Sequence, residues 1–156
     1  MLSRSIVTLI AMIFWCVESA QAVFDEQQCS NVLREIAEES GAVVVRETEL
    51  GRQHLRHGSA NEFVLYCGTL GLEANLTADT ATPDRLFFDL VALVGQFAMG
   101  EASEALRPVA IQCQKRALTS PEELAKVSTK HGDIECHSFA RDGGGTHLSW
   151  FRRYNN

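Results

Sequence analysis

The chain has 156 residues, a formal net charge of −6 and five cysteines. Apolar residues make up 46% of it and charged residues 22%, a globular composition that excludes a disordered chain, a collagen-like repeat and a polytopic membrane protein. The acidic balance also disfavours nucleic acid as a partner, because polyanions attract surfaces rich in lysine and arginine.

The first 22 residues have the three parts of a cleavable export signal. Arg4 is the only charge before an apolar run over residues 6–17, and Ala20-Gln21-Ala22 supplies a small-x-small cleavage site. The apolar run is too short to span a bilayer, which needs ~20 residues. We therefore expect cleavage near Ala22, one domain over residues 23–156, and a periplasmic or secreted protein that is not an integral membrane protein.

Four cysteines remain after this cleavage. An even number in an exported chain predicts two disulfides, because compartments outside the cytoplasm are oxidising. Four cysteines allow three pairings, and we favour Cys29–Cys67 with Cys113–Cys136, because each bridge ties a helix to a strand and together they cross the fewest segments. No pair has the C-x-x-C spacing of zinc sites, and no cysteine is left over as a catalytic thiol.

The first half of the domain predicts one helix followed by strands. Apolar residues at helical spacing predict a helix over residues 27–40, which Gly41 ends. Turn residues then separate three strand-like runs, over residues 42–49, 52–57 and 62–70. The third run is apolar on both faces, since Phe63 lies on one face and Val64 on the other. We therefore expect it to be central in its sheet.

A polar connector over residues 77–82 precedes a strongly apolar helix. Thr82 and Pro83 have the residue types of an N-cap and first helical position and should open this helix, whose residues 86–99 are nearly all apolar. Such a helix is buried or faces a partner, and burial is the preferred interpretation. If it faces a partner, the candidate interface consists of Phe87, Val91, Val94 and Phe97.

Two further helices are predicted before the last strands. Residues 103–118 have helical spacing, and Pro108 should kink or restart that helix. The sequence from Ser120 to Glu123 has the pattern of a capping box, which predicts a short helix to about Lys130.

The end of the chain predicts a β-hairpin around a glycine-rich turn at residues 141–145. A five-residue loop places Cys136 opposite Trp150 and buries both, so we prefer this register. The whole is an α+β fold in the order α-β-β-β-α-α-β-β, with two or three helices before the last two strands. About five antiparallel strands form its sheet, with the helices packed on one face and two disulfides.

The two histidines of this hairpin are the strongest candidates for a ligand or metal face. In the preferred register His137 and His147 share the solvent face, placed diagonally, within reach of Glu135. The alternative, which we prefer, is two surface histidines on a half-wet sheet. Asp89 is the best candidate for a general acid, although it lies on the polar stripe of its helix.

No catalytic residue, metal or cofactor is assigned, because hydrolase, metalloprotease and phosphate-loop motifs are missing from the sequence. His54 and His57, three apart on a strand, are interpreted as part of an exposed polar hairpin.

The sequence therefore favours an exported, disulfide-stabilised accessory module that binds an unidentified protein partner or small ligand in the cell envelope. A structural component of an envelope assembly is one alternative. A small enzyme that uses the His137/His147 face or Asp89 is the other, and an enzyme is the less favoured class.

Overall fold

The computed structural model describes residues 26–48, 51–68 and 71–152. The expected export signal lies outside these residues. The elements are α1 (Glu26–Ser40), β1 (Val43–Glu47), β2 (Arg52–His57), β3 (Ala60–Gly68), β4 (Gly71–Ala78), α2 (Arg85–Met99), α3 (Ser103–Thr119), β5 (Leu124–Ser128), β6 (Gly132–Phe139), a short 3₁₀ turn (Arg141–Gly143) and β7 (Gly145–Arg152).

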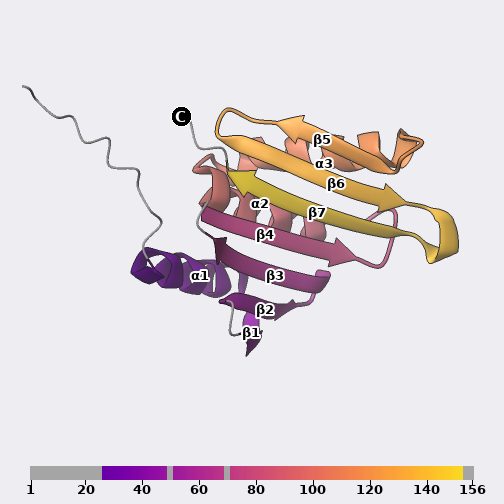
Figure 1. Ribbon diagram of the computed structural model, residues 1–156. Coiled ribbons are helices and arrows are strands. Elements are labelled where there is room, and N and C mark those ends of the chain that lie inside the picture. The colour runs from indigo at the N-terminus through magenta and orange to yellow at the C-terminus, as the bar shows by residue number, and fades with distance from the viewer. Residues whose placement is uncertain (1–25, 49–50, 69–70, 153–156) are drawn as a thin grey trace, which may run out of the picture.

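All seven strands form one antiparallel sheet in the order β1-β2-β3-β4-β7-β6-β5. Helices α2 and α3 lie behind this sheet in Figure 1, whereas none of the described helices covers the face toward the viewer. The predicted α+β class is thus confirmed, but the sheet has seven strands instead of about five.

The packing of the helices also differs from the prediction. Helices α2 and α3 pack directly on the sheet, over β4 and β7 and over β5 and β6 respectively. Helix α1 packs mainly against α2 and contacts the sheet at β3, with Leu33 and Ile36 buried in the core. The three helices therefore do not form one even layer.

Strand β4 has no counterpart in the sequence-based prediction. Its inward residues are Leu72, Ala74, Leu76 and Ala78, all buried. They alternate with polar residues, as a half-buried strand requires, but alanine is a poor strand former, which weakens the signal.

Strand β5 replaces the short helix predicted after Ser120. The Ser120 hydroxyl accepts from the Glu122 N–H at 3.2 Å, and Glu123 adopts a positive φ of 58°. The residues of the expected capping box thus form a turn. Val127, which follows them, lies on strand β5 and is buried.

Two other local predictions are corrected. The N-cap of α2 is Asp84, whose carboxylate accepts from the Phe87 N–H at 3.0 Å, so the cap is not Thr82. The predicted restart at Pro108 does not occur, because α3 continues through this residue in its first half, whereas the predicted kink stays a prediction.

The terminal hairpin has the predicted faces but a shifted register. His137 lies opposite His147, and Trp150 lies opposite Ile134 instead of Cys136. The five-residue loop begins one residue earlier than expected, because Gly145 belongs to the strand. A Cβ at Gly145 would lie 2.6 Å from the Phe139 ring, so glycine lets the aromatic side chain cover the pair.

Trp150 joins the sheet to α2. Its side chain is fully buried, and its indole N–H donates to the carbonyl of Val91 at 2.9 Å. A Cβ at Gly95 would lie 2.7 Å from the indole ring, so only a glycine lets α2 approach this closely.

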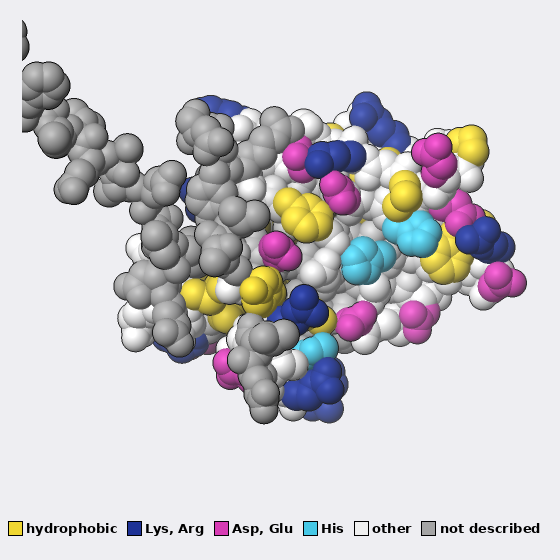
Figure 2. Space-filling model, in the orientation of Figure 1, with side chains coloured by type: hydrophobic (Ala, Val, Ile, Leu, Met, Phe, Trp, Pro, Cys, Tyr) yellow, Lys and Arg dark blue, Asp and Glu magenta, His cyan; other side chains and the backbone are white. Residues whose placement is uncertain are grey.

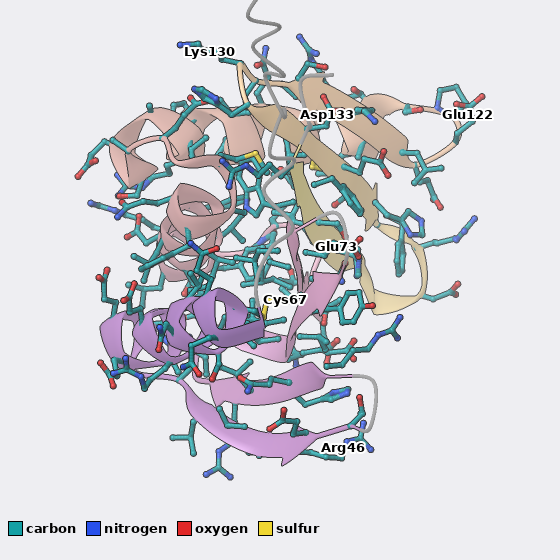
Figure 3. The ribbon with its side chains drawn as sticks, turned by 60° about the vertical axis from the view of Figure 1, so that its left-hand side comes forward. Arg46, Cys67, Glu73, Glu122, Lys130 and Asp133 are labelled. Carbon is teal, nitrogen blue, oxygen red and sulfur yellow. A yellow bond between two sulfur atoms is a disulfide. The ribbon has the colours of Figure 1, made fainter. Side chains whose placement is uncertain are left out.

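Both predicted disulfides are present, Cys29–Cys67 between α1 and β3 and Cys113–Cys136 between α3 and β6. Figure 3 shows Cys67 beside α1. They differ in accessibility, since Cys113 and Cys136 are buried whereas Cys29 and Cys67 are half-buried.

The substitution Gly95→Ala is expected to destabilise the protein by about 2 kcal/mol. Displacement of Trp150 and loss of its hydrogen bond outweigh the gain of about 1 kcal/mol in helix propensity. Urea unfolding measures the change. The control is Gly58→Ala, where an added Cβ meets nothing within 4 Å. Equal stability of the two variants would contradict the close packing of α2.

Mild reductant is expected to open Cys29–Cys67 well before Cys113–Cys136, because thiol attack requires access to a sulfur. Alkylation followed by mass spectrometry of peptides gives the order of opening. In denaturant, which exposes both bridges, the difference should disappear. Earlier alkylation of Cys113 in the native protein would contradict the burial of that bridge.

Candidate functional site

The face of the sheet without helices carries polar side chains in three cross-strand rows. Figure 2 shows this face, with histidine side chains gathered near its centre. The middle row is His54, Val64, Asn75, Ser149, Glu135 and Lys126. The row on one side of it is Glu62, Thr77, His147, His137 and Leu124, and the row on the other side is Arg52, Tyr66, Glu73, Phe151, Asp133 and Ser128.

The centre of the middle row is recessed. Val64 and Ser149 are buried although they point away from the helices, and Asn75 between them is half-buried. Longer side chains from the two outer rows stand around them. The result is a cavity of about 320 Å³, which we call the sheet recess, lined by Arg52, His54, Glu62, Val64, Tyr66, Glu73, Asn75 and His147.

A chain of hydrogen bonds fixes one wall of the recess. The Ser149 hydroxyl donates to Asn75 Oδ1 at 2.5 Å, and the same hydroxyl lies 2.8 Å from His147 Nε2. Because the single hydroxyl proton is used toward Asn75, His147 Nε2 is the donor in the second bond. In the neutral ring, Nδ1 is then an acceptor.

The neutral form of His147 is the favoured one. Burial lowers the pKa of His147 below its ordinary value of 6.5, opposed by the negative charge of Glu62 and reinforced by His137. A catalytic serine donates its hydroxyl proton to a histidine that acts as the base. Ser149 instead donates to Asn75 and accepts from His147, so His147 does not act as a base toward it. The contact is therefore a positioning contact and not a nucleophile–base pair.

The basic groups at the end of the recess are held by neighbours. Arg46 Nη2 lies 3.0 Å from His54 Nε2, and because arginine only donates, this histidine nitrogen accepts and the ring is neutral in this contact. The guanidinium of Arg52 lies over the Tyr66 ring, 5.4 Å from its centroid.

Two carboxylates of the recess, Glu62 and Glu73, form no ion pair with any residue of the described ranges. They stand in opposite outer rows, and Figure 3 shows Glu73 on the side of the sheet away from the helices. The recess is therefore rich in hydrogen-bond acceptors.

The structure brings His137 and His147 together but separates them from Glu135. The two histidines are directly opposite across β6 and β7, not diagonal. Glu135 pairs with Lys126 at 3.0 Å, and the His137 Nε2 atom lies 3.9 Å from a Glu123 carboxylate oxygen. In the part of the chain that the structure describes, no three His, Cys, Asp or Glu side chains are placed to hold a metal ion.

Asp89 is an ion-pairing residue between two helices. Its carboxylate contacts Arg107 of α3 and lies 3.5 Å from Arg85 of α2. Two arginines therefore surround this carboxyl group, in place of the apolar surroundings that a general acid needs.

The apolar residues proposed as an interface on α2 belong mostly to the core. Phe87, Val91 and Val94 are buried at 1% exposure or less, and Phe97 is half-buried against the same core. Phe87, Val91 and Val94 are therefore covered by other parts of this fold, and only part of Phe97 is exposed.

A second, larger hollow of about 580 Å³ lies along the outer side of α3. The described residues that line it all come from this one helix, with Pro108 at one end and Thr119 at the other. It is a groove on a helix surface without converging polar groups.

Among the described residues, no helix alone has the length and hydropathy of a membrane span, and α2 and α3 pass that test only as a pair bent by 115°.

Sequence reasoning missed Glu62, Glu73, Asn75 and Ser149 as members of a site. Two of them are on the strand that was not predicted, so their rows could not be aligned. The available signal was the alternation of Glu73, Asn75 and Thr77 with the apolar residues of the same strand, namely Leu72, Ala74, Leu76 and Ala78.

Comparison of the chain with protein-family models, curated proteins and solved structures finds no match.

His147 is expected to remain neutral, as the Nε2–H tautomer, at pH values where the unfolded chain carries a proton on it. Folding then favours the unprotonated ring. The contribution of His147 to the free energy of unfolding should therefore be fully present above pH 6.5 and should decrease as the pH falls below it. Ring nitrogen shifts measured by NMR report the tautomer, and urea-unfolded protein is the control. A folded-state pKa of His147 at or above the unfolded value would contradict this.

Proposed function

We propose that this protein is an exported binding module that holds a small polar ligand, or a polar side chain of a partner protein, in the sheet recess. The single observation that carries this proposal is the recess itself, whose polar groups converge on a cavity on the face that no described helix covers. Cavities of roughly 300–1,000 Å³ with few oriented polar groups are typical of ligand sites.

The orientation of the recess residues supports binding more than chemistry. Asn75, Ser149 and His147 are held in fixed positions by hydrogen bonds to one another. Fixed polar groups lose little entropy when a ligand arrives, which improves affinity. Ser149 is the member of this hydrogen-bond chain that carries a hydroxyl group. It is buried, and it donates its hydrogen bond to the amide oxygen of Asn75.

The disulfides support the proposal that the protein functions in an oxidising compartment. Two bridges tie flanking helices to the sheet that carries the recess. This agrees with the export signal expected from residues 1–22, whose cleavage would be seen as Val23 at the N-terminus of the protein recovered from the envelope.

A screen of small amines, carboxylates, amides and sugars against the oxidised protein tests the proposal. Backbone NMR shifts should cluster at Val64, Asn75 and His147 for at least one class of compound. The variant Asn75→Leu, which blocks the floor with an apolar group, should abolish those shifts. The control Glu135→Gln, on the same face but paired with Lys126 outside the recess, should keep them.

The absence of recess shifts at millimolar concentrations of every class would overturn the proposal, since fragments with useful contacts bind in or below this range.

A further inference from the structure

We propose that the sheet recess takes a linear aliphatic ammonium, the group carried by a free diamine or by a lysine side chain. This inference rests on the proposed function and adds the chemical class of the ligand. It is carried by the two carboxylates without ion-pair partners among the described residues, Glu62 and Glu73, and by the acceptors between them.

The other charges around the recess are compatible with a cation. His54 Nε2 accepts from Arg46, so that nitrogen carries no proton, and burial disfavours the charged form of His147. Tyr66 offers a ring that already attracts one cation, the guanidinium of Arg52. The formal charge inside the recess is then negative, with two carboxylates against one arginine stacked at its edge.

Other ligand classes fit less well. An anion would meet two carboxylates at short range, and like charges in a confined site repel. An apolar ligand would leave the carboxylates and the Asn75 amide without water or partners, which costs more than its own burial contributes. A neutral alcohol can donate hydrogen bonds to the same acceptors, but bonds from an ammonium are about twice as strong.

The placement of the carboxylates suits a linear molecule. Glu62 and Glu73 belong to the two outer rows, whose backbones lie about 13 Å apart because four residues separate the rows along a strand. Both side chains line the recess together with Val64, whose methyl groups offer an apolar surface to methylene groups. An alkyl chain across the floor therefore brings an ammonium to one wall or to both.

Calorimetric and NMR titrations of the oxidised full chain with four probes test this class. The amine probes are 1,5-diaminopentane and Nα-acetyl-lysine methylamide. The comparison probes are 1,5-pentanediol, of the same length but neutral, and glutarate, which is anionic. We expect both amines to shift Val64, Asn75 and His147, the diol to bind at least tenfold more weakly than the diamine, and glutarate to produce no recess shifts.

Charge variants that keep side-chain size sharpen the test. Glu62→Gln and Glu73→Gln should each weaken the diamine about five- to tenfold, the effect of one charge-assisted hydrogen bond. Arg52→Gln should strengthen it, because it removes the competing cation from Tyr66. Glu135→Gln, outside the recess, should change nothing. Circular dichroism and the recess shifts of each unliganded variant show whether the fold is kept.

The two amines distinguish the sources of the ammonium. Equal affinity for both, with only one glutamate variant affecting the lysine probe, supports a lysine side chain of a partner protein. Tighter binding of the diamine, weakened by both variants, supports a free diamine.

Recess binding of glutarate or of the diol as tight as that of the diamine overturns the inference, as does weaker amine binding in Arg52→Gln. In those cases the recess still binds a ligand and the proposed function stands. Failure of every class in the wider screen would remove both.

Discussion

The fold depends on the contact between Trp150 and α2. The indole ring lies where a side chain at position 95 would be, and its N–H satisfies the carbonyl of Val91 inside the core. This contact holds the helix backbone directly against β7, the fifth of the seven strands in the sheet. The apolar residues of β4 and β7 are therefore committed to the helix side, and the pleat sends their polar neighbours to the other side.

The recess follows from this alternation together with the lengths of the outward side chains. At the centre of the open face, the middle row consists of a valine, an asparagine and a serine. Both neighbouring rows carry glutamate and a ring-bearing side chain, namely His147 on one side and Tyr66 on the other. A row of short side chains between two rows of longer ones leaves a hollow on the sheet. Residues of four strands line this hollow, and no loop or bulge among the described residues contributes to it.

Much of this architecture could be predicted from the sequence, and the rest fails for physical reasons. The parity of the last hairpin was correct because burying Trp150 determines which residues face the core, even though the Gly145–Phe139 pairing shifted the register by two. The cysteine pairing followed from the even count and from the elements expected around each residue. Strand β4 was missed because its alanines carry little strand preference, and Ser120 to Glu123 satisfied a turn in place of a helix. The site was lost with β4, since only the pairing of β4 with β3 and β7 brings Glu62, Asn75 and His147 together.

The two disulfides constrain strands on both sides of the sheet recess. Cys67 directly follows Tyr66 on β3, and its bridge to α1 ties down the end of the strand that supplies one wall. Cys136 lies next to His137 on β6, which pairs with His147, and its bridge to α3 holds the other side from below. A shallow recess gives a ligand few contacts, so affinity depends on how little ordering those contacts require. Cross-links that hold both walls in place would reduce that ordering, so the same disulfides that suit an oxidising compartment would also suit the binding role proposed for the open sheet face.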